Sequence, residues 1–234
     1  MLTYIQYNNG RLREIDVPDS CQIVRVVNPS PEELEHLAAV SQAPMDFLTA
    51  ATDRDERPRL EVEDGCQLIV IRVPHRVASE DAPFITLAFA IVLTPNLIIT
   101  VCSEASTVWH DVLALPRSFP CPSNRLAFLS AFFLQVARQY LGFLKQIREQ
   151  SDAVENAIHG SMKNEMLIRL LSLEKCLVYF TTSLRANDPI WDRFRRLNGR
   201  ELTPEEQALA GRLTQKYEDA AWTLARKKDG FPVE

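Results

Sequence analysis

Acidic and basic side chains alternate over one short segment of the sequence, residues 53–61, which reads Asp-Arg-Asp-Glu-Arg-Pro-Arg-Leu-Glu. Its carboxylates could bind a divalent cation, since Mg²⁺ needs only one or two of them beside its own waters. A calcium loop of the EF-hand type is excluded, because the segment has neither the glycine nor the distal glutamate of such a loop. The alternating charges could equally neutralise one another where the chain enters a strand. A cation site and a set of ion pairs are therefore both open from these residues.

The histidines and cysteines form no pattern of a metal centre or an enzyme. None has a second histidine or cysteine at the spacing of zinc ligands, and an odd number of scattered cysteines argues against a disulfide framework. The sequence also has no Walker A, G-x-S-x-G, H-E-x-x-H or G-x-G-x-x-G motif. We therefore expect a protein that is not an enzyme and has no catalytic residue. The residues concerned are His36, His75, His110, His159, Cys21, Cys66, Cys102, Cys121 and Cys176.

The composition is that of an ordinary folded protein of the reducing cytosol. Of the 234 residues, 46% are hydrophobic and 24% are charged, which suits one large domain or a domain with an extension. The net charge of −5 argues against a nucleic-acid partner, because such a surface would need clustered lysine and arginine. Residues 1–7 have neither the basic nor the long apolar region of a signal peptide.

Two apolar stretches need to be tested as membrane spans, which take about 20 apolar residues. Residues 85–101 are interrupted by a turn signal at residues 94–96 and are better explained as two buried strands. Residues 126–144 carry Arg138 near their middle, where a charge would be costly in lipid. We expect neither stretch to span a bilayer, and the second to be a buried helix.

The first half of the chain is predicted to form a sheet with two helices. The Asn-Asn-Gly sequence at residues 8–10 is a hairpin signal. Ser30 can cap a helix that has Pro31 in its first turn. Residues 67–73 are apolar on both faces and are expected in the middle of the sheet. Strands are expected at 2–7, 12–17, 21–27, 60–62, 67–73, 86–93 and 97–102, and helices from residue 31 and over 44–52.

The second half is predicted to be helical, because its apolar residues recur at the spacing of a helix. One long helix is expected over 125–159 and another over 164–187, where the Asn-Asp-Pro sequence at 187–189 weakens or kinks it before it resumes over 190–197. A third helix is expected from Thr203. The predicted fold class is α/β (α+β), with a mixed sheet followed by long antiparallel helices. The expected division is 1–122 for the sheet part, 123–200 for the helical hairpin and 201–234 for the start of a further helix.

Three blocks of the sequence together match one known family. The first is the segment 53–61, of pattern D-x-x-E-R-P-R-x-E, followed by an apolar strand that ends in proline at residue 74. The second is the predicted hairpin over 89–101, which closes on Thr-Val. The third and strongest is LSLEKCLVYFTTSLRAN at residues 171–187. In this order the blocks resemble the N-terminal cytoplasmic domain of CorA-type magnesium and cobalt transporters, over most of residues 30–200.

The resemblance implies a fold, an assembly and a location. The fold is an α/β/α sandwich with a long helical hairpin and then a stalk helix, of which residues 201–234 would be a truncated start. In the family the stalk leads into two membrane helices, the first ending in Gly-Met-Asn, and five subunits form a pore for hydrated Mg²⁺. The resemblance therefore implies self-association as a homopentamer, Mg²⁺ or Co²⁺ as a weakly bound regulatory ligand, and the cytoplasmic side of the inner membrane. Without those membrane helices, the chain is expected to be an excised domain or a soluble relative.

The residues that would sense the cation do not transfer directly from the family. Some members carry an acidic pair in the helix before the R-P block, where this chain has Thr49 and Ala50. The resemblance then leaves nearby acids as candidate ligands between subunits: Asp46 or Asp53 from one subunit, and Glu218 or Asp219 from its neighbour. Four further residues are expected to organise the entrance to the strand without binding ions, namely Arg57, Pro58, Arg59 and Glu61.

Two other functions stay open beside an ion-sensing domain of a Mg²⁺ or Co²⁺ transporter. One is a zinc-transporting relative of the same superfamily, which the sparse histidines and cysteines do not favour. The other is a soluble protein whose helical hairpin binds partners and has no role in transport.

Overall fold

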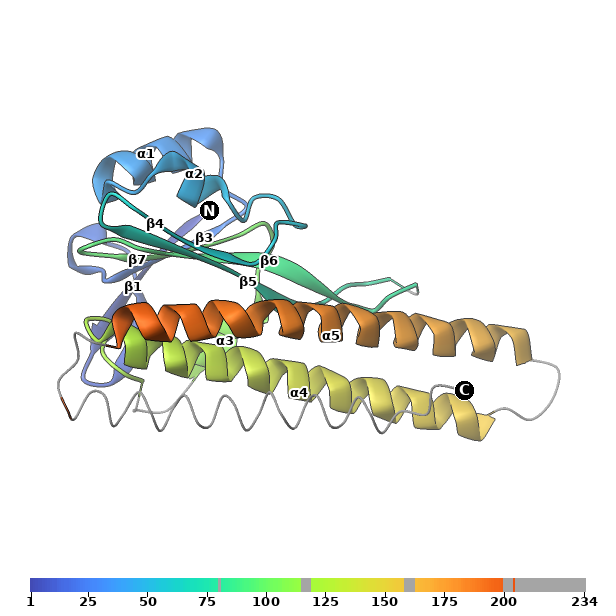
Figure 1. Ribbon diagram of the computed structural model, residues 1–234. Coiled ribbons are helices and arrows are strands. Elements are labelled where there is room, and N and C mark those ends of the chain that lie inside the picture. The colour runs from blue at the N-terminus through green and yellow to red at the C-terminus, as the bar shows by residue number, and fades with distance from the viewer. Residues whose placement is uncertain (80, 115–118, 158–162, 200–203, 205–234) are drawn as a thin grey trace.

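A computed structural model of the chain describes residues 1–79, 81–114, 119–157, 163–199 and 204. The described elements form three layers, with a seven-stranded sheet in the middle (Figure 1). The predicted α/β fold, with long antiparallel helices after a mixed sheet, is confirmed. One face of the sheet carries α1 (Pro31–Ser41) and α2 (Met45–Thr49), and the other carries α3 (Thr107–Ala114), α4 (Arg125–Ala157) and α5 (Lys163–Asn198).

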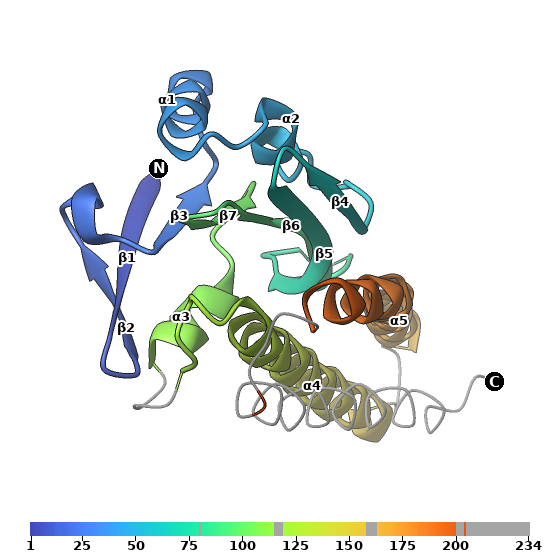
Figure 2. The same cartoon turned by 60° about the vertical axis from the view of Figure 1, so that its left-hand side comes forward.

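The sheet has the strand order β2-β1-β3-β7-β6-β5-β4. Only β3 and β7 pair in parallel, and the other neighbours are antiparallel. Figure 2 shows the β1–β2 hairpin at one edge and β4 at the other. The strands are β1 (Leu2–Asn8), β2 (Arg11–Ile15), β3 (Ile23–Val27), β4 (Arg59–Glu63), β5 (Cys66–Arg76), β6 (Phe84–Leu93) and β7 (Ile98–Cys102), with a short 3-10 helix at Pro18–Ser20.

Two hairpins form where the sequence offers residues that tolerate positive φ. Asn9 and Gly10 have φ of 48° and 80° between β1 and β2, and Asp64 and Gly65 have 49° and 74° between β4 and β5. Two successive residues of positive φ give the turn whose twist suits antiparallel strands. The hairpin predicted from residues 8–10 is confirmed.

Helix α1 begins as its sequence predicts. The Ser30 hydroxyl accepts a hydrogen bond from the Glu33 amide at 3.2 Å, and the Glu33 carboxylate accepts one from the Ser30 amide at 3.0 Å. This capping box satisfies two of the amides that a helix start leaves unpaired. Helix α2 follows and ends at Thr49, and residues 50–58 then connect it to β4; this segment is called the α2–β4 loop below.

Strand β5 is covered on both faces, but it lies next to the edge strand β4 and not in the middle of the sheet as the sequence predicts. Ile69 and Ile71 pack in the cluster that includes α4 and α5, whereas Leu68 and Val70 pack in the cluster that includes α1 and α2. All four side chains are fully buried, as expected for a strand covered on both faces. Because one cluster joins the sheet to the long helices, the division at residues 122 and 200 stays a prediction.

Helix α3 is absent from the elements expected from the sequence. It has only eight residues, too few for a clear helical period. Its start carries a signal, since the Ser106 hydroxyl accepts from the Val108 amide at 3.3 Å. Its burial rests on Trp109, whose indole N–H donates to the Thr100 hydroxyl at 2.9 Å.

Helix α4 begins where the sequence predicts, at Arg125, and Asn124 caps it: the Asn124 side-chain oxygen accepts from the Ala127 amide at 3.0 Å. Among the described residues, it is the one helix long and apolar enough to cross a membrane, and 78% of its most apolar window is buried inside the protein. Packing on the sheet and on α5 accounts for that apolar character, as it does for the core helix of many globular proteins.

Helix α5 continues through residues 187–189, where the sequence predicts that it weakens or kinks before it resumes. It is one helix from Lys163 to Asn198, with Pro189 inside it. Proline lacks the amide for one helical hydrogen bond, but the residues beyond it are held by the core. Trp191 and Phe194 are buried there, and Trp191 stacks on Phe133 with the ring centres 4.9 Å apart. Tertiary packing therefore outweighs the local signal.

Candidate functional site

The α2–β4 loop carries most of the alternating charges, and one arginine of the sheet holds its backbone. Arg72, on β5, donates from Nη1 to the carbonyl oxygens of Arg54 and Glu56, at 2.6 and 3.3 Å. From Nη2 it donates to the carbonyl oxygen of Thr86, on β6, at 2.6 Å. The Arg54 carbonyl also accepts from the Ala88 amide of β6 at 3.2 Å. The loop is thus attached to the sheet at two of its peptide groups.

The guanidinium of Arg72 is largely withdrawn from water, with its side chain 13% exposed. Burial lowers the pKa of Arg72 from its usual value, while Tyr140, Asp55 and Asp53 act in the opposite direction. An arginine stays protonated in proteins, so this cation needs partners in the fold. The carbonyl groups of the loop supply them, and the Asp55 carboxylate lies 4.0 Å away.

A second connection fixes the Arg54 side chain. Its Nη2 lies 3.1 Å from one carboxylate oxygen of Glu104, which follows β7. The other oxygen of Glu104 lies 3.1 Å from Nε2 of His75, on β5. Glu104 therefore ties the loop to the ends of two strands.

The four residues expected at the strand entrance have different roles. Arg59 lies 2.8 Å from the Glu56 carboxylate and donates to Glu61 at 2.6 Å. The Arg57 side chain is exposed, and the Arg57 backbone amide donates to the Glu56 carboxylate at 2.8 Å. β4 begins directly after Pro58, which has no amide to offer to a sheet. The alternating charges thus include ion pairs centred on Arg59.

We expect Arg59 and Glu56 to be coupled in stability, and Arg57 and Glu56 to be uncoupled. Both members of the Arg59–Glu56 pair are partly exposed, so the coupling free energy should be about 0.2–1 kcal/mol. A double-mutant cycle with Arg59→Ala and Glu56→Ala, measured by urea unfolding, gives this value, and Arg57→Ala with Glu56→Ala is the matched control. If Arg57→Ala instead weakened a response to cations at unchanged stability, Arg57 would have a direct role in function.

Two of the four candidate cation ligands lie within the described part of the chain. Asp46 is exposed in the first turn of α2 and Asp53 is exposed in the α2–β4 loop. The Asp53 carboxylate accepts from the amide of Asp55 at 2.9 Å. Among described residues, neither carboxylate forms an ion pair. Glu218 and Asp219 lie outside the described residues.

Asp46 lies close to Thr49 and Ala50, the two positions where some family members carry an acidic pair. It precedes Thr49 by three residues, about one helical turn, so the two lie on neighbouring parts of one helix face. The hydroxyl of Thr49 donates to the Asp46 carbonyl at 3.2 Å. Ala50 is only 5% exposed, so an acid there would be forced toward the core.

The carboxylates of the described residues do not build a complete metal centre. No group of three or more His, Cys, Asp or Glu side chains that could hold a metal occurs among them. Mg²⁺ keeps several waters and can bind through one or two carboxylates. Asp46 and Asp53 could therefore supply at most part of a weak site, to be completed by water or by another chain.

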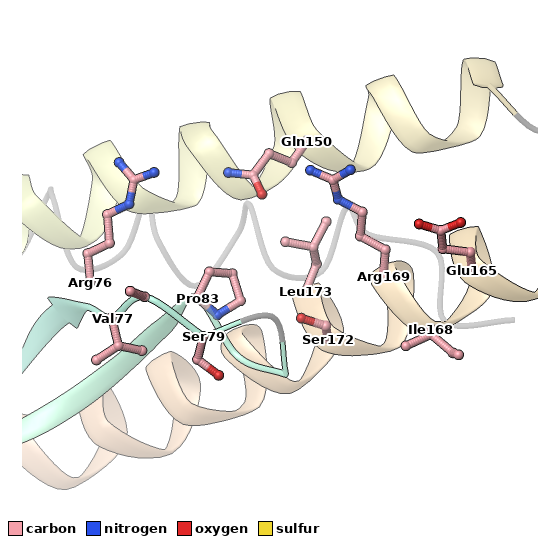
Figure 3. Close-up of a pocket in the computed structure, with 11 residues that line it drawn as sticks. Arg76, Val77, Ser79, Pro83, Gln150, Glu165, Ile168, Arg169, Ser172 and Leu173 are labelled. Atoms are coloured by element: carbon pink, nitrogen blue, oxygen red, sulfur yellow. The ribbon is translucent and has the colours of Figure 1, made fainter.

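A large groove lies elsewhere, between the β5–β6 connection and the helices α4 and α5. It measures about 1110 Å³ and is lined by Arg76, Gln150, Glu165 and Arg169 among others. Arg76 and Arg169 extend to the same side of this groove (Figure 3). Two guanidinium groups against one carboxylate repel cations, so the groove is a poor site for Mg²⁺.

Comparison with known proteins assigns the chain to a family. A family model described as CorA-like Mg²⁺ transporter protein matches residues 19–226. The chain belongs to this CorA-like family. The resemblance seen in the three sequence blocks is thereby confirmed, and the family is one of transporters.

CorA-like proteins of known sequence and structure agree with this assignment. The cobalt/magnesium transport protein CorA of Methanocaldococcus jannaschii is 26% identical over 190 residues, which is 80% of this chain and 56% of that protein. The chain therefore spans about half the length of this curated relative.

Solved CorA-like structures share the fold. The soluble domain of CorA from M. jannaschii matches with a TM-score of 0.74 at 20% identity, over 98% of this chain and 92% of that one. The complete CorA transporter from the same organism gives 0.73 at 20% identity, over 98% and 73%. The ZntB cytoplasmic domain from Vibrio parahaemolyticus gives 0.60 at 14% identity, over 97% and 95%. At such identities the likeness concerns the fold alone.

Proposed function

We propose that this chain is the cytoplasmic, ion-sensing part of a CorA-like divalent cation transporter, placed on the cytoplasmic side of the inner membrane. The family match over residues 19–226 carries this proposal, and the fold of the soluble domain of CorA supports it. The ion is Mg²⁺ or Co²⁺, which acts as a regulatory ligand. The pore is formed by other segments of the whole protein, in a homopentamer.

The cation binds between subunits in this proposal. Asp46 or Asp53 of one chain and Glu218 or Asp219 of its neighbour supply the carboxylates, and waters complete the coordination. The exposure of Asp46 and Asp53 supports the proposal, because such carboxylates are available to a second chain. With one or two carboxylates from each side, we expect a dissociation constant of about 1 mM or higher. The corresponding binding free energy is at most about 4 kcal/mol.

Removing the two described carboxylates should weaken cation binding. In calorimetric titrations with Mg²⁺ and with Co²⁺, the Asp46→Asn, Asp53→Asn double variant should bind roughly tenfold more weakly than the unchanged chain. Glu35→Gln, at an exposed acid of α1, is the matched control and should bind as the unchanged chain does. Equal binding by the double variant and the control would place the cation elsewhere.

A Zn²⁺ titration addresses the zinc-transporting alternative, which the shared fold of the ZntB domain keeps open. Zinc sites in proteins use histidine and cysteine beside carboxylates, and the described residues hold no such cluster. We therefore expect Zn²⁺ to bind no more tightly than Co²⁺. A chain that binds none of the three cations would instead fit an interaction protein.

A further inference from the structure

Arg72 stands where the α2–β4 loop, the sheet and helix α5 meet. We propose that Arg72 is a positioning residue, which holds the α2–β4 loop in the shape that lets Asp53 bind a cation and which joins this loop to α5. This inference rests on the proposed function of that loop as part of a cation site.

On the side of the loop, the contacts of Arg72 lie next to Asp53 in the chain. The carbonyl group of Arg54, at 2.6 Å from Nη1, belongs to the residue that directly follows Asp53. The carbonyl group of Glu56, at 3.3 Å, follows the turn in which Asp53 accepts from Asp55. The direction of the Asp53 carboxylate therefore depends on peptide groups that Arg72 holds in place.

On the side of the helix, the backbone of Arg72 is bound by α5 instead of by a strand. The Asn187 side chain accepts from the Arg72 amide and donates to the Arg72 carbonyl, both at 2.8 Å. Pairing of β4 with β5 ends at Arg59 and Val70, because Pro58 has no amide with which to continue the sheet. Asn187 thus takes the place of the missing strand residue.

A second contact with α5 runs through Thr86. Its hydroxyl lies 2.8 Å from the hydroxyl of Ser183, and its carbonyl oxygen accepts from Arg72. A shift of the guanidinium would therefore disturb contacts with the loop and with α5 together. A cation bound at the loop is therefore connected to helix α5 through the contacts of Arg72 and Thr86.

The geometry requires arginine and not only a positive charge. The planar guanidinium reaches oxygens of three residues, Arg54, Glu56 and Thr86, whereas a lysine ammonium places all its donors at one point. Its charge in fact opposes the binding of Mg²⁺ at the loop. The guanidinium lies beside the loop, 4.0 Å from the Asp55 carboxylate, and two cations repel each other. A purely electrostatic role therefore predicts tighter Mg²⁺ binding without the charge, and a positioning role predicts weaker binding.

Two variants of Arg72 separate these roles. Arg72→Lys keeps the positive charge but loses the planar guanidinium, and Arg72→Met loses both the charge and the guanidinium. In calorimetric titrations with Mg²⁺, we expect both variants to raise the dissociation constant roughly threefold or more. Without Mg²⁺, we expect faster hydrogen exchange at the amides of residues 53–57 in both. Trp191→Ala, which removes a buried side chain of α5 and leaves the hydrogen bonds of Arg72 in place, is the control for general loss of stability and should keep the dissociation constant within about twofold.

Three results would overturn the inference. The first is an Arg72→Met variant that binds Mg²⁺ as tightly as the unchanged chain or more tightly. The second is a Trp191→Ala variant that weakens binding as much as Arg72→Lys does. The third is unchanged hydrogen exchange of residues 53–57 in Arg72→Lys. An unchanged chain that binds no Mg²⁺ would refute the proposed function instead, and hydrogen exchange would still decide whether Arg72 holds the loop.

Discussion

Replacing Trp191 by alanine should destabilise the protein by about 3–5 kcal/mol, the range for removing a large aromatic side chain from a core. Trp191 lies two residues beyond Pro189 and is 2% exposed. Its ring contacts Phe133 of α4 and Phe194 of α5, with ring centres 4.9 and 6.0 Å apart. The end of α5 is therefore part of the core, although a proline precedes it.

Urea unfolding followed by circular dichroism measures this loss. Leu197→Ala is the matched control, because Leu197 lies on the same end of α5 and is 46% exposed. The free energy of unfolding of the Leu197→Ala variant should differ from that of the unchanged chain by no more than about 0.5 kcal/mol. A loss below about 1 kcal/mol for Trp191→Ala would mean that α5 does not pack on α4 beyond Pro189.

Replacing Asn187 by alanine should lower the free energy of unfolding by about 2–4 kcal/mol. The change removes two hydrogen bonds to the backbone of Arg72. The Arg72 carbonyl keeps the Tyr140 hydroxyl, which donates to it at 3.1 Å, but the amide loses the acceptor that Asn187 gives it. Leaving the buried amide unpaired costs about 1–3 kcal/mol, and losing the bond to the carbonyl, which keeps another donor, costs about 1 kcal/mol.

The free energy of unfolding again reports the result, with Asn164→Ala as control. Asn164 lies near the start of the same helix and is exposed, so its replacement should change stability by less than about 0.5 kcal/mol. Equal stabilities of the two variants would contradict the view that Asn187 completes the edge of β5.

Much of the fold could be predicted because local signals and tertiary packing agree there. Residues 8–10 specify a tight hairpin whatever surrounds them, since asparagine and glycine tolerate positive φ. Ser30 and Glu33 cap a helix through contacts only three residues apart. The apolar run in β5 predicted that both faces of this strand are covered, which is confirmed. Its expected place in the middle of the sheet is wrong, because β5 lies next to the edge strand β4, and strand order depends on pairing between distant segments.

The rest depended on contacts between distant residues. The Asn-Asp-Pro sequence at 187–189 predicted a weakened or kinked stretch with a helix on either side. Trp191 and Phe194 are buried in the core, and the helix runs through the proline without interruption. The eight residues of α3 are too few to show a helical period, so their burial through Trp109 could not be foreseen.

The roles of Arg72 and Glu104 were likewise hidden, although Arg72 left one signal. It is a lone charge inside an apolar strand, and a buried charge requires partners. The sequence could not say that those partners are the carbonyl groups of the α2–β4 loop, which lies 14–22 residues earlier. Glu104 carried no comparable signal, and its link to Arg54 and His75 exists only in the folded chain.

We propose that divalent cations bind between subunits, at the carboxylates of α2 and of the α2–β4 loop. Sedimentation velocity of the unchanged chain at micromolar concentration, with and without Mg²⁺ and beside a calorimetric titration, tests it most directly. We predict a monomer or a loose oligomer without Mg²⁺, and larger species as Mg²⁺ reaches the millimolar range, where binding heat also appears. Tight binding to a monomer would show that the ligands lie within one chain, and the assignment of Asp46, Asp53, Glu218 and Asp219 would then have to be abandoned.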